Sequence, residues 1–573
     1  MKSCTFYSLM VMSVFYSEKT AAQNALYIPP VLTGTDFQLN VQSGTQTFFN
    51  GYQTPTYGIN MPFMAPTLFF NKGDSVSLHV TNNLTIETTM HWHGLHVPSK
   101  YDGGPHQIIE PGQTWDATYK VMNDASTYWY HPHGLGKTDL QISKGLAGLI
   151  IVKDSNETSL NLPRTYGVDD FPLIVQSKAF DVLYQIAIAT ELDTVVMVNG
   201  TKNPYLDAPA QMVRFRILNG SSMRSYDFGF SNNIPFYQIS SDGGLLSSPI
   251  PLTRVLLAPA ERAEIVVYFG MLEGQTVYFK NYGSELPDGI FGAAKVGNDT
   301  VSIPEYNLNP LNGADYNILQ INIGAPTPNA ITSIPASLAT VTPLSETNAT
   351  LTRNFIFAPQ DTTDIQQMVE GPFTINGAQF SMDTINFTTY KNTTEIWELD
   401  NQSLLAHAIH VHDVQFNILD RNGTPPFDNE MGKKDVVLVM PMEIVRVIMK
   451  FQDFTDDSIP YMYHCHMLHH EDDGMMISFL VRDSSSVGIN EVQGNTLKLF
   501  PNPANDVIEV TLAQSSFQKF SLNLYNILGN EINIPYQVNP QNIRLDVSSL
   551  SKGMYLVKLI ADNKVFSQKF LKY

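Results

Sequence analysis

The chain has 573 residues, with 54 acidic and 34 basic side chains, so its formal net charge is −20. Only 15% of the residues are charged and 43% are hydrophobic, which excludes a disordered chain and a coiled coil. The acidic balance leaves no basic face for phosphates, so nucleic acid is excluded as a partner. The two cysteines, Cys4 and Cys465, cannot form a disulfide framework.

The first 22 residues have the pattern of a secretory signal. Lys2 precedes a mostly apolar stretch at 6–16, followed by polar residues and by small residues that end at Ala22. We expect cleavage near Ala22, which would remove Cys4 and leave one cysteine; a disordered N-terminus is the alternative. No part of the sequence supplies an apolar run of about 18 residues, so no transmembrane segment is predicted.

Residues 25–482 consist of short β-branched and aromatic runs broken by Gly, Pro and Asn, with little helical periodicity. This texture predicts an all-β fold of sandwiches or barrels. Residues 25–160 and 345–482 share a layout in which an alternating strand precedes an HxH motif and a second HxH follows, which indicates a duplicated unit. The part between them, 165–335, contains no histidine and therefore can donate no imidazole to a site.

Ten of the fourteen histidines are candidate metal ligands, and these ten fall in four short motifs. The motifs are HWHG (His91, His93), HPHG (His131, His133), HAIHVH (His407, His410, His412) and HCHMLHHEDDGMM (His464, His466, His470). In a strand, residues i and i+2 point the same way, so each HxH offers two imidazoles from one face. Four such pairs exceed what one ion needs and predict a cluster of several ions. Imidazole alone leaves copper, zinc, iron and nickel open.

The last motif narrows the choice of metal. One thiolate, two imidazoles and a thioether describe a blue-copper site, whereas zinc would favour more cysteines or no methionine. Alternation turns His464 and His466 away from the side that Cys465 faces, so this tripeptide is predicted to touch two copper sites. The proposed donors of the blue site are Cys465, His407, His470 and Met475.

The remaining histidines and methionines are interpreted as ordinary packing residues. His79, His96 and His106 are expected in strands or loops. Spacing of four residues after His466 favours His470 over its neighbour His469 as the ligand. Met440 and Met442 are expected in the core or in loops.

With these motifs, and with LNG at 218–220, SDGG at 241–244 and ERAE at 261–264, the sequence resembles the three-domain multicopper oxidases. The resemblance implies three cupredoxin-like Greek-key domains, at 25–160, 165–335 and 345–482, with a trinuclear copper cluster between the first and third. Ala408 stands where the family usually has proline, which removes rigidity and no ligand. The resemblance implies about four coppers per chain, one in the blue site and three in the cluster. The implied cluster ligands are His91 and His410 (type 2), His93, His131 and His466 (one type 3 copper), and His133, His412 and His464 (the other).

The resemblance also implies a mechanism. A small-molecule substrate gives electrons singly to the blue copper, they pass through Cys465 to the cluster, and O₂ is reduced to water. Glu471 and Asp102 stand where the family places its proton donors and orienting carboxylates. The alternative for both is a surface charge.

The substrate class is the least constrained expectation. The motifs resemble the bacterial copper-efflux oxidases, spore-coat laccases and bilirubin oxidases. The copper-efflux branch carries a methionine-rich insertion, and a carboxylate and a methionine before the first blue-copper histidine. This chain has a short segment at 355–372 instead, and Ser403 and Leu405 at those two positions.

We therefore expect a laccase-like oxidase of phenols and aromatic amines, with axial Met475 favouring easily oxidised substrates. Cuprous oxidation and a bilirubin oxidase-like activity are the alternatives. From other classes, an electron-transfer or copper-sequestering cupredoxin and a copper nitrite reductase would both need fewer histidines than the chain has.

The C-terminal part has a different texture. After a polar linker at 483–496, residues 497–573 form short alternating strands, which predict a small β-sandwich. The motifs at 501–503 (PNP), Asp546, 553–555 (GMY) and Lys569 resemble the type A C-terminal sorting domain of the bacterial type IX secretion system. The resemblance implies the type IX machinery as partner and a secreted or cell-surface protein. A carbohydrate-binding or structural module, and a periplasmic location, are the alternatives.

Overall fold

The computed structural model describes residues 23–483, 497–511, 520–526, 530–539, 542–561 and 564–573. Contacts divide the chain after Asp483 into two compact units. The predicted signal segment 1–22, with Cys4, and residues 484–496 of the predicted linker lie outside the described residues. Within the described residues, no helix is long and apolar enough to cross a membrane.

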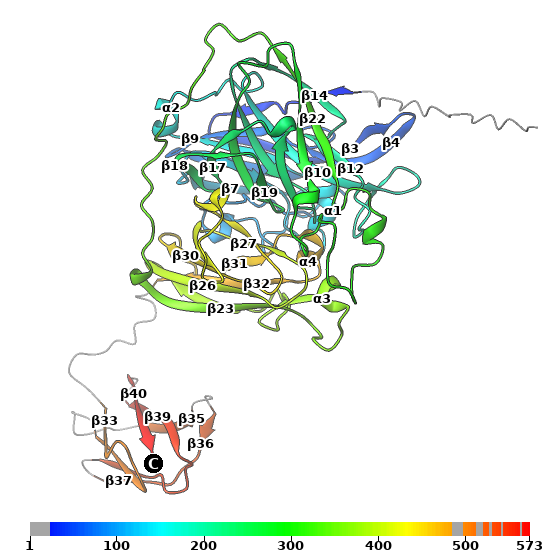
Figure 1. Ribbon diagram of the computed structural model, residues 1–573. Coiled ribbons are helices and arrows are strands. Elements are labelled where there is room, and N and C mark those ends of the chain that lie inside the picture. Colours follow the sequence, from blue (N-terminus) through cyan, green and yellow to red (C-terminus); the bar gives the residue numbers. More distant parts are fainter. Residues whose placement is uncertain (1–22, 484–496, 512–519, 527–529, 540–541, 562–563) are drawn as a thin grey trace, which may run out of the picture. The chain divides into compact units, whose positions relative to one another are not determined.

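Strands dominate both units, and the described residues form eight sheets (Figure 1). The predicted all-β fold is confirmed. The α-helices are short: α1 (Thr138–Ser143), α2 (Ser155–Ser159), α3 (Gln367–Glu370) and α4 (Leu468–Asp472). The 3₁₀ turns are η1 (Ser99–Tyr101), η2 (Ser231–Asn233), η3 (Gly283–Glu285), η4 (Tyr306–Leu308), η5 (Glu346–Asn348) and η6 (Asp428–Glu430).

The first pair of sheets is formed by residues 31–153. Its strands are β2 (Val31–Thr33), β3 (Asp36–Phe49), β4 (Tyr52–Ile59), β5 (Thr67–Asn71), β6 (Ser75–Asn82), β7 (Thr114–Lys120), β8 (Ser126–Tyr130) and β9 (Gly148–Lys153). One sheet has the order β4-β3-β6-β7 and the other β2-β5-β9-β8. Along β3, Phe37, Leu39 and Val41 are buried and alternate with exposed residues, so one face of the strand covers the core.

The second pair contains β1 (Asn24–Ala25), β10 (Asp170–Phe180), β11 (Ile186–Ala187), β12 (Val195–Val198), β13 (Thr201–Lys202), β14 (Pro204–Pro209), β15 (Met212–Asn219), β16 (Tyr226–Phe230), β17 (Phe236–Ser241), β18 (Gly244–Leu252), β19 (Val255–Leu257), β20 (Arg262–Tyr268), β21 (Thr276–Tyr282) and β22 (Asp315–Gly324). The orders are β1-β14-β22-β21-β16-β19 and β13-β12-β10-β15-β20-β17-β18, with β11 beside β10. All of β15 is buried because it lies between β10 and β20. Asn24 and Ala25 pair with β14, so these two residues belong with this pair of sheets.

The third pair contains β23 (Ala349–Pro359), β24 (Phe373–Ile375), β25 (Phe387–Tyr390), β26 (Thr393–Asn401), β27 (His407–Val411), β28 (Phe416–Arg421), β29 (Val436–Val439), β30 (Ile444–Phe451), β31 (Tyr461–Cys465) and β32 (Met476–Arg482). The orders are β24-β23-β26-β30-β28 and β25-β32-β31-β27-β29. Its hydrophobic core is continuous with residues of the first two pairs, such as Trp129 and Phe291. The three pairs therefore pack as one body.

The C-terminal unit has two four-stranded sheets around its own core. Their orders are β33-β34-β38-β37 and β36-β35-β39-β40. Ile508, Leu545 and Val557 are among the buried residues between them. The strands are β33 (Lys498–Phe500), β34 (Val507–Thr511), β35 (Phe520–Asn526), β36 (Glu531–Ile532), β37 (Tyr536–Val538), β38 (Ile543–Asp546), β39 (Gly553–Ala561) and β40 (Lys564–Lys572).

Candidate metal centre

Backbone pairing brings the four HxH motifs together. β27 and β31 run antiparallel with His410 opposite His464. An isolated bridge joins His91 to His131, with backbone hydrogen bonds of 2.8 and 3.1 Å. All eight imidazoles of these motifs are at most 1% exposed. The first and third pairs of sheets therefore enclose one cluster of buried histidines.

One set of three ring nitrogens converges on a point. The Nε2 atoms of His133 and His412 lie 3.1 and 3.2 Å from Nε2 of His464. Hydrogen bonds hold the opposite side of two of these rings, because His464 donates from Nδ1 to the Cys465 carbonyl and His412 donates from Nδ1 to Asp102. The Nε2 lone pairs then face one another, which is unfavourable without a cation between them. This set fits one metal ion.

A second and a third set adjoin the first. Nε2 of His131 lies 3.4 Å from both Nδ1 of His93 and Nε2 of His466. Nε2 of His91 and Nε2 of His410 are buried and, within the described part of the chain, have no hydrogen-bond partner. An unpaired buried polar atom costs about 1–3 kcal/mol, which a bound metal ion would remove. Neighbouring sets share members, as expected of adjacent ions in one cluster.

On the other side of β31, His407, Cys465 and His470 form a further metal-binding group. Cys465 Sγ lies 3.7 Å from His407 Nδ1 and 3.6 Å from His470 Nδ1, and these two nitrogens are 3.3 Å apart. Met475 is fully buried, and its backbone hydrogen-bonds to both Cys465 and His470. One thiol and two imidazoles beside a methionine are the donor chemistry of a blue-copper site.

Burial sets the protonation of this group, and a hydrogen bond selects the ring nitrogen of His407. It raises the pKa of the Cys465 thiol to about 12 and lowers the pKa of His407 to about 3. The imidazole is therefore neutral and ready to bind a metal, while the thiol must release its proton when a metal binds. His407 Nε2 lies 3.0 Å from the buried Ser403 hydroxyl, and this hydrogen bond leaves Nδ1 directed at Cys465.

The two carboxylates singled out in the sequence both reach cluster histidines. Asp102, which follows η1, accepts from His412 Nδ1 at 2.7 Å through its side chain and from His91 Nδ1 at 2.8 Å through its carbonyl. Burial raises the pKa of Asp102. Glu471 on α4 has one oxygen 3.2 Å from His133 Nδ1 and the other 3.2 Å from His464 Nδ1. Both residues are buried, so the surface-charge alternative is wrong.

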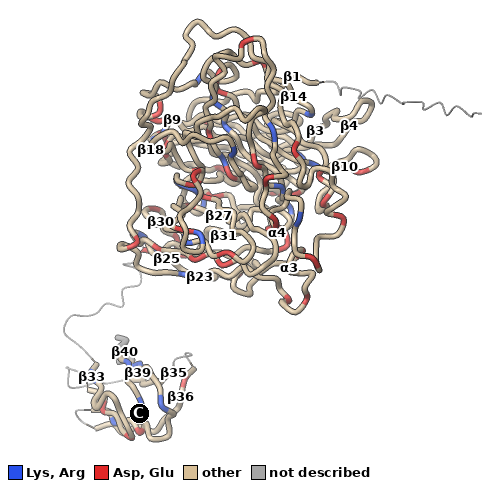
Figure 2. Tube along the Cα trace, viewed as in Figure 1, with Lys and Arg blue, Asp and Glu red and all other residues tan. Residues whose placement is uncertain are grey.

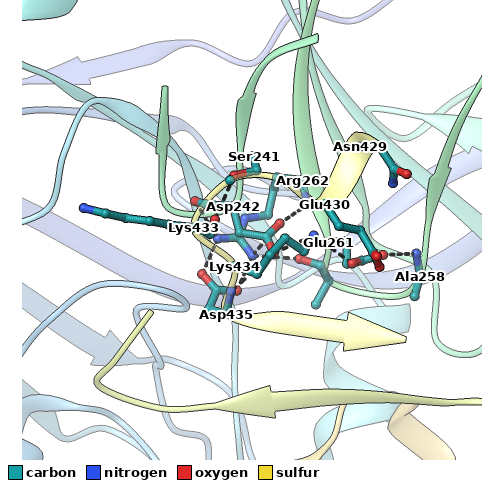
Figure 3. A network of polar contacts seen from close by, with 12 residues as sticks. Ser241, Asp242, Ala258, Glu261, Arg262, Asn429, Glu430, Lys433, Lys434 and Asp435 are labelled. Carbon is teal, nitrogen blue, oxygen red and sulfur yellow. Dashed lines mark hydrogen bonds and ion pairs between the residues drawn. The ribbon is translucent and has the colours of Figure 1, made fainter. Parts of the chain in front are cut away.

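The structure adds a third carboxylate that no motif indicated. Asp435 lies 3.1 Å from His93 Nε2, and its carbonyl accepts from His410 Nδ1 at 2.7 Å. Arg262, on β20, holds the carboxylate through both of its terminal nitrogens. Figure 3 shows this pair within a buried network in which Lys434 also bridges Asp242 and Glu261. The histidine-free second pair of sheets thus contributes to the cluster through Arg262.

The other histidines lie outside the two groups of donors. His79 faces Asp116 at the surface, His96 lies between Asp413 and Asp453, and His106 contacts the Met382 carbonyl. His469 does not belong to the group of His407, Cys465 and His470, and its Nε2 lies 2.9 Å from Asp139. Met440 packs against the core, and Met442 is 57% exposed.

Residues 40–157 and 350–485 match family models of the multicopper oxidases. Over 453 residues the chain is 33% identical to multicopper oxidase mco of Staphylococcus haemolyticus, covering 77% of this chain and 87% of that protein. The chain belongs to the multicopper oxidase family. It is also 30% identical over 468 residues to cell division protein FtsP of Escherichia coli, covering 80% of this chain and 93% of FtsP.

The fold agrees with this assignment. The crystal structure of a laccase from Pediococcus acidilactici superposes with a TM-score of 0.69 at 30% identity, covering 81% of this chain and 94% of that one. Family membership implies copper as the metal of this multicopper oxidase, and the thiol, imidazole and methionine donors fit it.

Residues 498–573 match the family model of a secretion system C-terminal sorting domain, which confirms the predicted sorting domain. This multicopper oxidase therefore carries a sorting tail, which suggests secretion or a place on the cell surface.

Proposed function

We propose that the protein couples one-electron oxidation of phenols or aromatic amines to four-electron reduction of O₂ to water. The observation that carries the proposal is the position of Cys465. Its thiol joins the group with His407 and His470, while its neighbours His464 and His466 belong to the buried histidine cluster. One tripeptide therefore links a site that can accept single electrons to a site large enough to collect four.

About four coppers would occupy these residues. Type 1 copper would bind His407, Cys465, His470 and Met475, type 2 copper His91 and His410, and the two type 3 coppers His93, His131 and His466, and His133, His412 and His464. Bound copper would supply the one-electron redox chemistry and the reduction of O₂.

The polypeptide itself does three things: it connects the two sites, it keeps bulk water out and it supplies protons. Cys465 connects its sulfur covalently to the two adjacent imidazoles. Burial of all eight cluster histidines keeps bulk water from the site where O₂ is reduced. Asp102 and Glu471 are buried carboxylates in contact with cluster rings, and we assign them the delivery of the four protons that water formation consumes.

The laccase-like activity ranks ahead of cuprous oxidation because of the residues before His407. Ser403 is buried and its hydroxyl contacts His407, and Leu405 is buried as well. Neither offers the carboxylate or thioether that a cuprous ion would need there. Similarity to FtsP favours a second candidate, a role in cell division. The convergent donors with unpaired lone pairs favour the oxidase.

The sorting tail supports a proposal on location. We infer export by an N-terminal signal followed by type IX secretion, which delivers the enzyme outside the cell or to its surface.

The test is oxygen uptake by copper-loaded protein with a phenol, bilirubin and Cu(I) compared side by side. We expect the highest rate with the phenol, about four coppers per chain, and loss of blue colour and of substrate oxidation in Cys465→Ser. Negligible rates on all three substrates would contradict the oxidase. A full activity in Cys465→Ser would contradict the electron route.

A further inference from the structure

An open cavity of about 580 Å³ lies beside the group of Cys465, between α1, α3, α4 and the segments at 188–191 and 303–305. His470 is among its lining residues, although its side chain is only 4% exposed overall. His470 Nδ1 is directed at Cys465 and His407. Nε2 lies on the other side of the ring and has no hydrogen-bond partner in the described residues. This unpaired edge is where the cavity meets the proposed electron-accepting site.

The cavity wall is strongly acidic, and Figure 2 shows acidic positions at α3 and α4. Its only cationic side chain is His469, which pairs with Asp139 at 2.9 Å. Asp472 is also engaged, because its side chain accepts from the backbone N–H groups of Thr138 and Asp139 at the start of α1. The lining carboxylates are Asp139, Glu191, Glu305, Glu370, Asp472 and Asp473.

Four of these carboxylates form no ion pair within the described part of the chain: Glu191, Glu305, Glu370 and Asp473. One oxygen of Glu191 is buried without a hydrogen-bond partner. Burial raises the pKa of Glu191; the charges of His469 and Arg224 oppose this shift, and those of Asp193 and Glu370 add to it. Six carboxylates line the cavity against the one cationic imidazole of His469, so the wall carries an excess of negative charge.

Apart from Thr190, the rest of the wall is apolar and suits an aromatic ring. Its apolar residues are Ile188, Met223, Ile303, Pro304 and Val369. A volume of several hundred cubic ångströms exceeds what a bare metal ion needs and is typical of a site for a small organic ligand.

We propose that the reducing substrate is an organic cation, an oxidisable aromatic ring with a positively charged substituent. The ring lies toward His470 and the charge among Glu191, Glu305 and Glu370. The inference rests on the proposed oxidase function and names its substrate class. Four substrate molecules each lose one electron, and one O₂ takes up four electrons and four protons to give two waters.

The test compares two catechols with the same ring and opposite charge, dopamine and 3,4-dihydroxyhydrocinnamate. We expect the ratio of their kcat/KM values to favour dopamine about tenfold or more at low salt and to fall as salt is added. In the double variant Glu305→Gln/Glu370→Gln, the ratio should fall at least about tenfold, since two charges are removed near the ligand. Glu273→Gln, an exposed carboxylate on the loop before β21, removes the same kind of charge elsewhere and should leave the ratio unchanged.

A ratio near one in the natural protein, or an unchanged ratio in the double variant, would overturn the inference. A double variant that slows Cu(I) oxidation more than dopamine oxidation would identify the substrate as a metal cation and overturn the organic cation. Phenyltrimethylammonium is an organic cation that is not oxidised. Calorimetry of its binding therefore tests the cation site separately from the proposed oxidase function. If no substrate is oxidised, the oxidase fails, yet tighter binding of this cation to the natural protein than to the double variant still supports a cation site. Equal binding rejects that site.

Discussion

Arg262 holds Asp435 with two charge-assisted hydrogen bonds, of 2.6 and 2.5 Å, although the two residues come from different pairs of sheets. Both side chains are fully buried. Asp435 also faces His93 Nε2 at 3.1 Å, so one carboxylate connects all three pairs of sheets. The contact fixes which nitrogen of His93 is free: Nε2 is engaged by Asp435, and Nδ1 faces His131.

Asp435→Asn should weaken copper binding in the cluster without removing the blue site. The neutral amide loses the charge that orients His93, and loss of such a partner typically costs about 10–100-fold in metal affinity. Copper content by mass spectrometry after dialysis against a chelator measures the effect. Arg254→Gln, which breaks a partly exposed ion pair with Glu285, is the control. Unchanged copper retention in Asp435→Asn would show that Asp435 does not position His93.

Ser403→Ala should disturb only the blue site. The substitution removes the hydroxyl that engages His407 Nε2, so the ring can rotate and its Nδ1 is less well directed at Cys465. We expect a shifted blue absorption and about tenfold faster loss of this copper to a chelator. Ser478→Ala removes an equally buried hydroxyl that contacts the Thr384 carbonyl, and its spectrum should match that of the natural protein. Identical spectra for both variants would refute the role of Ser403.

Glu471→Gln should separate substrate oxidation from oxygen reduction. Glutamine keeps the shape but cannot deliver a proton to the cluster, and loss of a general acid typically costs about 10²–10⁴-fold in rate. Under anaerobic conditions, substrate should still bleach the blue absorption at the natural rate, while steady-state oxygen uptake falls. Asp383→Asn, an exposed carboxylate, serves as the control. Equal losses in both half-reactions would point to misfolding instead of proton delivery.

His96 should make stability depend on pH. Burial by itself would lower its pKa, but Asp413 and Asp453 raise the pKa to about 9. Its Nδ1 lies 2.9 Å from Asp413 and its Nε2 lies 2.6 Å from Asp453, and the ring of Phe454 packs against it. The folded pKa is above the unfolded value of about 6.5. The charged ring therefore stabilises the fold fully below about pH 6.5, and this contribution is lost as the pH rises through about 9.

We expect His96→Gln to lower the free energy of unfolding by about 1–3 kcal/mol at pH 6.5, and with it the unfolding temperature. The substitution should have little effect at pH 10. Thermal unfolding across this range measures the difference. His79→Gln breaks an exposed pair with Asp116 and should change stability by less than about 1 kcal/mol. A His96→Gln deficit that is the same at both pH values would show that packing, and not charge, is what the residue contributes.

Much of the candidate site could be predicted because its signals are local. HxH spacing places two imidazoles on one side of a strand, and the eleven residues from Cys465 to Met475 carry a thiol, imidazoles and a methionine. The predicted fold, the family and the sorting domain are confirmed for the same reason, since alternation and short motifs recur along the chain. Ser403 was noted only for the ligand it lacks, because a hydrogen bond to His407 has no sequence pattern.

The sequence by itself determined the kinds of candidate donor, their pairing on strand faces and the thiol among them, because these follow from residue type and covalent spacing. Only the tertiary structure decided how the donors meet and what holds them. Arg262 and Asp435 are 173 residues apart, and His93 and Asp435 are 342 apart. Contacts of this kind form where different pairs of sheets pack against one another. No periodicity or motif in the sequence therefore predicts them. The acidic cavity beside His470 has the same origin, since its carboxylates come from five segments that are distant in the sequence.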